Sequence, residues 1–220
     1  MNILTTRPGP LTGSDAARQK INRALQLLSQ TKEDNTELAD VFESSAELFH
    51  GYEPHVKAID FDRPSKDVSH HGTALREKAD GATGSISEGN DELRDLTSTT
   101  SQILALVEGA KNDIKDSNTT ALWRLESAEN DLSYVNDSNI PGLKRASRIS
   151  KRLLNEDLPP YLAEVEADEP GRDVGRFADD IQEIWQRAHQ EVRRAPIYSR
   201  SNARQFFSAE HFLLRAKDAL

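Results

Sequence analysis

The sequence has no cysteine, few aromatic residues and no long apolar run, and each absence excludes a class of structure. Without cysteine the chain can form no disulfide, no thiolate metal site and no cysteine nucleophile. Aromatic residues make up only 6% of the chain, so aliphatic side chains and alanine must form the core, which suits narrow contacts between helices. The longest strongly apolar run, residues 103–107, is far shorter than the roughly 20 residues that span a membrane.

The sequence also lacks the common motifs of enzyme active sites. It contains no Gly-x-Gly-x-x-Gly, no phosphate-binding loop with Gly-Lys-Ser/Thr, no Gly-x-Ser-x-Gly and no His-Glu-x-x-His. Narrow contacts between helices leave little room for the apolar pocket that an enzyme usually needs. We therefore expect a non-enzymatic protein with no cofactor and no small-molecule substrate.

The N-terminal residues do not resemble a cleaved signal peptide, because they lack a basic start followed by an apolar centre. We therefore expect a cytoplasmic protein, or one exported without a cleavable signal. Residues 1–13 contain Pro8, Pro10 and two glycines, a composition that predicts an extended arm rather than a helix.

The chain is acidic, and its charge is unevenly distributed. The formal net charge is −9. Residues 1–139 carry 14 Lys and Arg against 24 Asp and Glu, whereas residues 140–220 carry 14 against 13. Overall acidity argues against nucleic acid as the partner. We instead expect the C-terminal third to dock with favourable electrostatics against the acidic rod formed by the long helix of the same chain.

Residues 82–140 carry a stripe of apolar and small residues at steps of three and four, which predicts a long helix buried along one narrow face. The steps alternate except at Ala121, where one step of four directly follows another, a stutter that would locally unwind a supercoil. The stripe positions are Ile86, Gly89, Leu93, Leu96, Thr100, Ile103, Val107, Ala110, Ile114, Ser117, Ala121, Leu125, Ala128, Leu132, Val135 and Asn139. The stripe extends upstream, so we predict one helix over 66–138, ended by Ile140-Pro141-Gly142. Some 55 to 60 residues of helix are about 85 Å long, so an elongated molecule is expected.

A second stripe predicts a helix over 14–50 that packs antiparallel to the long one. Its positions are Ile21, Ala24, Leu28, Thr31, Asn35, Leu38, Phe42, Ser45 and Phe49. Three shorter helices follow over 143–158, 172–195 and 199–220, the first ended by Pro159-Pro160. The predicted fold is all-α: residues 14–220 form a single elongated antiparallel bundle with coiled-coil-like heptad packing around one very long central helix.

A pairing of carboxylate and imidazole that bundle metal sites use occurs at Glu47 and His50, which lie three residues apart. Asp67 and His70 repeat this spacing, with His71 beside them. A metal site would need further inward-pointing carboxylates, and the sequence has no second Glu-x-x-His. Acidic surface residues near helix ends are the simpler interpretation, and we predict no metal ligand.

The sharpest charge feature is a basic cluster in the helix predicted at 143–158. It consists of Lys144, Arg145, Arg148, Lys151 and Arg152. Several of these residues share one helix face, which predicts a surface for an anion or for a partner. The alternative is pairing with acidic neighbours such as Glu156 and Asp157, and the overall acidity favours this alternative. The arginines of the last two helices, including Arg187 and Arg200, have the same two interpretations.

Three functions from different classes agree with these patterns. The first is a structural or interaction protein that acts through protein–protein association, as an assembly subunit, adaptor or spacer, with self-association expected. The second is a helical protein that binds a membrane surface or forms a pore. The third is a helical-bundle metal protein built on Glu47 and His50. The heptad stripes favour the first.

Overall fold

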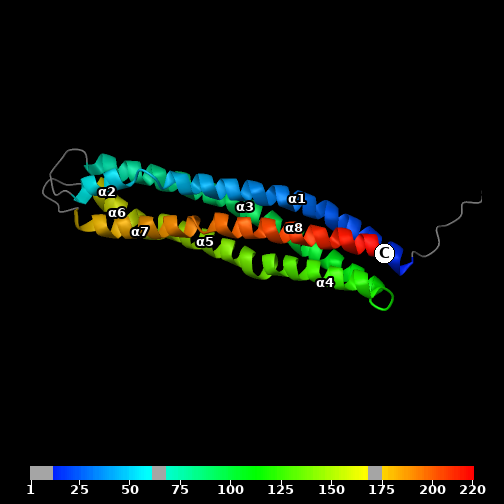
Figure 1. The fold of residues 1–220 in the computed structure, drawn as a ribbon. Coiled ribbons are helices and arrows are strands. Elements are labelled where there is room, and N and C mark those ends of the chain that lie inside the picture. The colour runs from blue at the N-terminus through cyan, green and yellow to red at the C-terminus, as the bar shows by residue number, and fades with distance from the viewer. Residues whose placement is uncertain (1–11, 61–67, 168–174) are drawn as a thin grey trace, which may run out of the picture. The chain divides into compact units, whose positions relative to one another are not determined.

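The structure is a computed structural model that describes residues 12–60, 68–167 and 175–220 (Figure 1). These residues form helices α1 (Gly13–Leu48), α2 (Glu53–Asp60), α3 (Val68–Ile114), α4 (Thr119–Tyr134), η1 (Val135–Asn139), α5 (Ile140–Arg152), η2 (Leu153–Asp157), α6 (Pro159–Glu166), η3 (Gly175–Phe177), α7 (Ala178–Val192) and α8 (Ala195–Ala219). The prediction of an all-α helical bundle is confirmed. The predicted N-terminal arm lies outside the described residues, except for its last two.

The chain divides into two compact units. Unit 1 comprises residues 1–33, 96–138 and 202–220, and unit 2 comprises residues 34–95 and 139–201. Helices α1, α3 and α8 contribute residues to both units. Within the described part of the chain, no helix is both long enough and apolar enough to cross a membrane.

Unit 1 is built from antiparallel helix pairs. The ammonium group of Lys20 on α1 lies 2.7 Å from the carboxylate of Asp113 near the end of α3. Lys111 of α3 pairs with Glu129 of α4. At the other end of α4, the side chain of Asn118 donates a hydrogen bond of 2.7 Å to the carbonyl of Ala219 on α8. The antiparallel packing predicted for the first helix is therefore present in this unit.

The two predicted stripes coincide with the buried residues of α1, α3 and α4. The eight stripe residues of α1 and Phe49, just after its end, are all buried, and so is every residue of the longer stripe except Ser117. Small residues permit close approach, as expected: a Cβ at Gly89 would lie 3.2 Å from the ring of Phe42. Coiled-coil packing itself stays a prediction.

The prediction of one helix over 66–138 is wrong at residues 115–118. Helix α3 ends at Ile114, a turn follows, and α4 begins at Thr119. The side-chain oxygen of Asn118 accepts a hydrogen bond of 2.9 Å from the Ala121 N–H and so caps α4. Because the cap stabilises a new helix start, the stripe continues while the chain reverses. Ser117 lies in this turn and is exposed.

The predicted helix stops at Pro141 and at Pro159-Pro160 are also wrong. Each proline is preceded by a π-helical segment, η1 before Pro141 and η2 before Pro159, and helix α5 or α6 continues beyond it. In η2 the Leu158 N–H donates to the Leu153 carbonyl at 2.9 Å, five residues back. The wider π turn makes room for a proline ring, and prolines are tolerated at the start of the next helix, where an N–H is dispensable.

Close packing, rather than a turn, explains Gly142. A Cβ at this position would lie 2.6 Å from Cζ of Tyr198, at the start of α8. Next to it, the buried side chain of Asn139 donates a hydrogen bond of 3.0 Å to the hydroxyl of Ser201. These contacts hold the start of α5 against α8 within unit 2.

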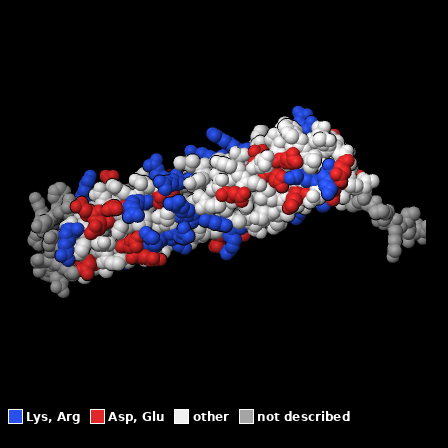
Figure 2. Space-filling view, turned by 90° about the horizontal axis from the view of Figure 1, so that it is seen from below, with Lys and Arg blue, Asp and Glu red and all other residues white. Residues whose placement is uncertain are grey.

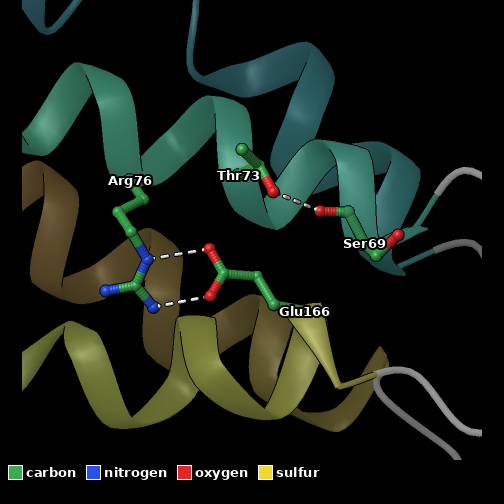
Figure 3. A network of polar contacts seen from close by, with 4 residues as sticks. All are labelled: Ser69, Thr73, Arg76 and Glu166. Carbon is green, nitrogen blue, oxygen red and sulfur yellow. Dashed lines mark hydrogen bonds and ion pairs between the residues drawn. The ribbon is translucent and has the colours of Figure 1, made fainter.

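Polar contacts also join α3 to α6 and η2 in unit 2. Arg76 of α3 forms a bidentate ion pair with Glu166 of α6, with both nitrogen-to-oxygen distances 2.8 Å (Figure 3). Nearby, the hydroxyl of Thr83 donates to the side-chain oxygen of Asn155 at 2.9 Å. Helix α5 itself packs on α7 (Figure 1). Within unit 2, helix α5 therefore contacts both α8 and α7.

Alanine at Gly142 and at Gly84 should have opposite effects. Nothing lies within 4 Å of a Cβ at Gly84, so Gly84→Ala should raise the free energy of unfolding by about 1 kcal/mol through helix propensity. Gly142→Ala should instead lower it by about 1 to 2 kcal/mol, because the Tyr198 ring must move. Urea unfolding measures both changes; equal gains would contradict the close contact.

Valine at Thr100 should stabilise the protein by about 1 kcal/mol. The Thr100 hydroxyl is buried and has no hydrogen-bond partner among the described residues, so replacing it removes a desolvation penalty. Thr31→Val is the matched control, because the Thr31 hydroxyl is equally buried but donates to the Leu27 carbonyl at 2.7 Å. Thermal unfolding should show the larger gain for Thr100→Val. An equal change in the two variants would contradict the difference in hydrogen bonding.

Candidate interaction surface

Helix α5 has an apolar face and a basic face. Its buried residues are Ile140, Leu143, Ala146, Ser147 and Ser150. The five residues of the predicted basic cluster lie between these buried positions, four of them exposed and Lys151 half-buried. Helical periodicity therefore separates the apolar contacts of unit 2 from the charged surface.

A groove of about 580 Å³ runs beside the basic face. It is lined by Asn90 of α3, by Lys144, Ser147, Arg148, Lys151 and Arg152 of α5, and by Asn155 and Glu156 of η2. The structure therefore brings four of the five predicted residues together in one groove. The fifth, Arg145, is exposed on α5 but does not line it.

The uncharged residues of the groove present hydrogen-bond donors. The Ser147 hydroxyl donates to the side-chain oxygen of Asn90 at 2.5 Å, and the Thr83 hydroxyl donates to that of Asn155 at 2.9 Å. Both amide oxygens are thus engaged, which leaves the two amide NH2 groups as donors. Cations and donors together favour an anionic occupant. The sequence did not predict Asn90 and Asn155 as groove residues, because nothing in it places α3 beside α5.

The pairing with acidic neighbours that the sequence favoured is found only for Arg152, which lies 3.5 Å from Asp157. Lys144, Arg145, Arg148 and Lys151 have no ion pair or side-chain hydrogen bond with any described residue. Of the five arginines in residues 187–204, three have an acidic partner among the described residues, whereas Arg193 and Arg204 have none. Arg187 pairs with Glu183, Arg194 with Glu191 and Arg200 with Glu43. Cations without an acidic partner in the described part of the chain are therefore more concentrated on α5, where they are four of five, than among these arginines, where they are two of five.

The space-filling view shows the same concentration of charge. Lys and Arg side chains gather on one part of the face drawn in Figure 2, and Asp and Glu side chains lie around them. On α5, Lys144 and Arg148 are four residues apart, and so are Arg148 and Arg152. Like charges at this spacing destabilise a helix by about 0.2 to 0.5 kcal/mol per pair, so the cluster lowers stability when unoccupied.

Histidines and aromatic residues meet in unit 2 where the turn that follows α1 contacts α7. The buried Trp185 donates a hydrogen bond of 3.1 Å from its ring nitrogen to the Phe49 carbonyl. The Phe49 ring stacks on His189 with 5.2 Å between centroids, and His50 meets His189 edge-on. Burial, then the charges of His50 and Arg193, lower the pKa of His189.

A second pair of histidines joins α2 to α3. The Nδ1 atoms of His55 and His71 lie 3.0 Å apart, so one ring donates to the other. Burial lowers the pKa of His55, and so do the charges of His71, Lys78 and His70. Sequence analysis considered His70 and His71 but missed His55.

No three metal-binding side chains come together among the described residues. Glu47 and His50 are both exposed, and the ring of His50 contacts another ring, that of His189. Asp67, the carboxylate predicted to accompany His70, lies outside the described residues.

The two tryptophans differ in burial. Trp185 is fully buried, as expected of a packing residue, whereas Trp123 is 60% exposed and meets the Phe212 ring edge-on in unit 1. Phe207 of α8 is 69% exposed.

Comparisons with known proteins give no family for this chain. No protein-family model matches it, and no curated protein is similar to it in sequence.

Acidification should destabilise the folded protein through the half-buried His55 and His189. Their pKa values are lower in the folded state than the ordinary 6.5, so the unfolded chain binds more protons as the pH falls below about 6.5. The free energy of unfolding should therefore decrease from pH 7.5 to pH 5.5. His189→Gln should reduce this decrease, measured by urea unfolding at each pH.

His211→Gln is the control, because His211 is exposed on α8. An identical pH dependence in wild type and His189→Gln would contradict the role given to burial.

Proposed function

We propose that the protein is a non-enzymatic interaction protein whose helical bundle presents the basic face of α5 to an acidic protein surface, as an assembly subunit, adaptor or spacer. The observation that carries this proposal is the groove in which Lys144, Arg148 and Lys151 lack any acidic partner among the described residues. Elsewhere in unit 2, Arg187 pairs with Glu183 and Arg200 pairs with Glu43, so some other arginines of this unit do have acidic partners.

The energetics support the proposal. The repulsion within the cluster costs stability, and among the described residues only the ion pair of Arg152 with Asp157 offsets it. Sites where a chain departs from its own stabilising pattern are often functional. An acidic partner would remove the repulsion and would gain charge-assisted hydrogen bonds from the guanidinium and amide groups.

The shape of the basic face favours a protein partner. Lys144 to Arg152 spans eight residues of helix, which corresponds to about 12 Å. A row of charges of this length suits carboxylates that are spread along another helix or strand. Complementary charges of this kind set the partner and the rate of association more than they set the affinity.

An oligo-glutamate peptide is a suitable probe for the groove. Wild type should bind the fluorescently labelled peptide at low salt, and Arg148→Glu with Lys151→Glu should weaken binding about tenfold or more, because two attractive charges become repulsive. Arg145→Glu is the matched control, since it changes the same charge on the same helix outside the groove. Fluorescence anisotropy measures all three proteins.

Equal binding by wild type and the double variant would overturn the proposal. A second outcome would replace it: if wild type floats with vesicles of phosphatidylserine but does not bind the peptide, the basic face binds a membrane surface instead.

A further inference from the structure

A carboxylate cluster lies on the side of unit 2 formed by α1 and α3. Gly89 of α3 contacts Phe42 of α1, and the two helices are antiparallel. Residues five to eight positions earlier on α1 and two to six positions later on α3 therefore lie on the same side of this contact. These residues include Asp34 and Glu37 of α1 and Asp91, Glu92 and Asp95 of α3.

The carboxylates of this cluster repel one another. Burial raises the pKa of Glu92, and so do the negative charges of Glu37, Asp34, Asp95 and Asp91. Arg94 lies beside these residues, with its guanidinium 3.0 Å from the carboxylate of Asp91. The cluster therefore carries five negative charges and one positive charge before any partner binds.

The cluster and the α5 groove cannot meet within one molecule. Asn90 of α3 lines the groove, whereas Glu92 belongs to the cluster. Residues two positions apart in an α-helix, such as Asn90 and Glu92, point in directions about 200° apart around its axis. The groove and Glu92 therefore lie on different sides of α3. Contact between them requires a second molecule.

We infer that the acidic partner of the α5 groove is a second copy of this chain, whose cluster of Asp34, Glu37, Asp91, Glu92 and Asp95 occupies the groove. This inference rests on the proposed function. The two surfaces are complementary in charge, because the groove has an excess of cations and the cluster has a comparable excess of carboxylates. Since two different patches form the contact, the association is heterologous: a pair of copies leaves the groove of one copy and the cluster of the other for further copies. Open chains or closed rings then follow.

Charge reversal on either side tests this contact. Sedimentation velocity should show that wild type associates as its concentration rises, and that about tenfold weaker association follows from raising the salt from 0.05 to 0.5 M. Arg148→Glu with Lys151→Glu should be monomeric, and so should Glu37→Lys with Glu92→Lys. The two variants should associate when mixed, because every groove then meets a cluster of opposite charge. The protein with all four changes should associate by itself.

Arg145→Glu is again the matched control and should associate like wild type. Circular dichroism confirms that each variant is folded. If the lysine variant does not fold, Glu37→Gln with Glu92→Gln replaces it and should weaken association with little cost to the fold.

Two results would overturn the inference: a wild type that stays monomeric under all conditions, or a mixture of the two reversed variants that stays monomeric. Binding of oligo-glutamate separates these failures from failure of the proposed function. A monomeric wild type that still binds the peptide through the groove refutes self-association alone, whereas loss of both refutes the proposed function as well.

Discussion

The backbone stays helical through Pro141 and Pro159 because each proline follows a segment whose hydrogen bonds span five residues. A proline lacks the N–H that an α-helix needs, and its ring clashes with the carbonyl four residues back. The wider turns of η1 and η2 accommodate both effects. The position of α5 depends on this continuity. A break at Pro141 would free α5 from the contacts of Asn139 and Gly142 with α8, and its charged side chains would no longer face a defined groove.

The burial pattern could be predicted from the sequence, whereas the path of the chain could not. Steps of three and four identify which side chains face a neighbour whether or not the helix is interrupted, so the stripe residues from Ile86 to Asn139 were correct except Ser117. The same pattern conceals the turn at 115–118, whose signal is the polar run that ends in the helix-capping Asn118. At Pro141 local propensity predicted a stop, and tertiary contacts outweighed it.

The basic residues of the candidate site could be predicted from the sequence, but whether they form ion pairs could not. The spacing from Lys144 to Arg152 identified the basic face, but an excess of Asp and Glu in the chain argued for internal ion pairs. Ion pairing depends on which helix lies opposite, and Asn90, which contacts Ser147, is 57 positions earlier in the chain. The composition of the chain does not show which residues so far apart in sequence meet. Only the packing of α3 against α5 shows that amide and hydroxyl groups, and not carboxylates, face most of these cations.

Amide hydrogen exchange across residues 131–166 tests the central claim most directly, because it reports whether the helix continues through both prolines. The account predicts that the amide protons of Ile140, Gly142 and Leu143 exchange as slowly as those in the middle of α5. Protection should continue through η2 to Leu158. Rapid exchange at residues 138–143 between two protected stretches would contradict it, because α5 would then be a separate helix with no fixed basic groove.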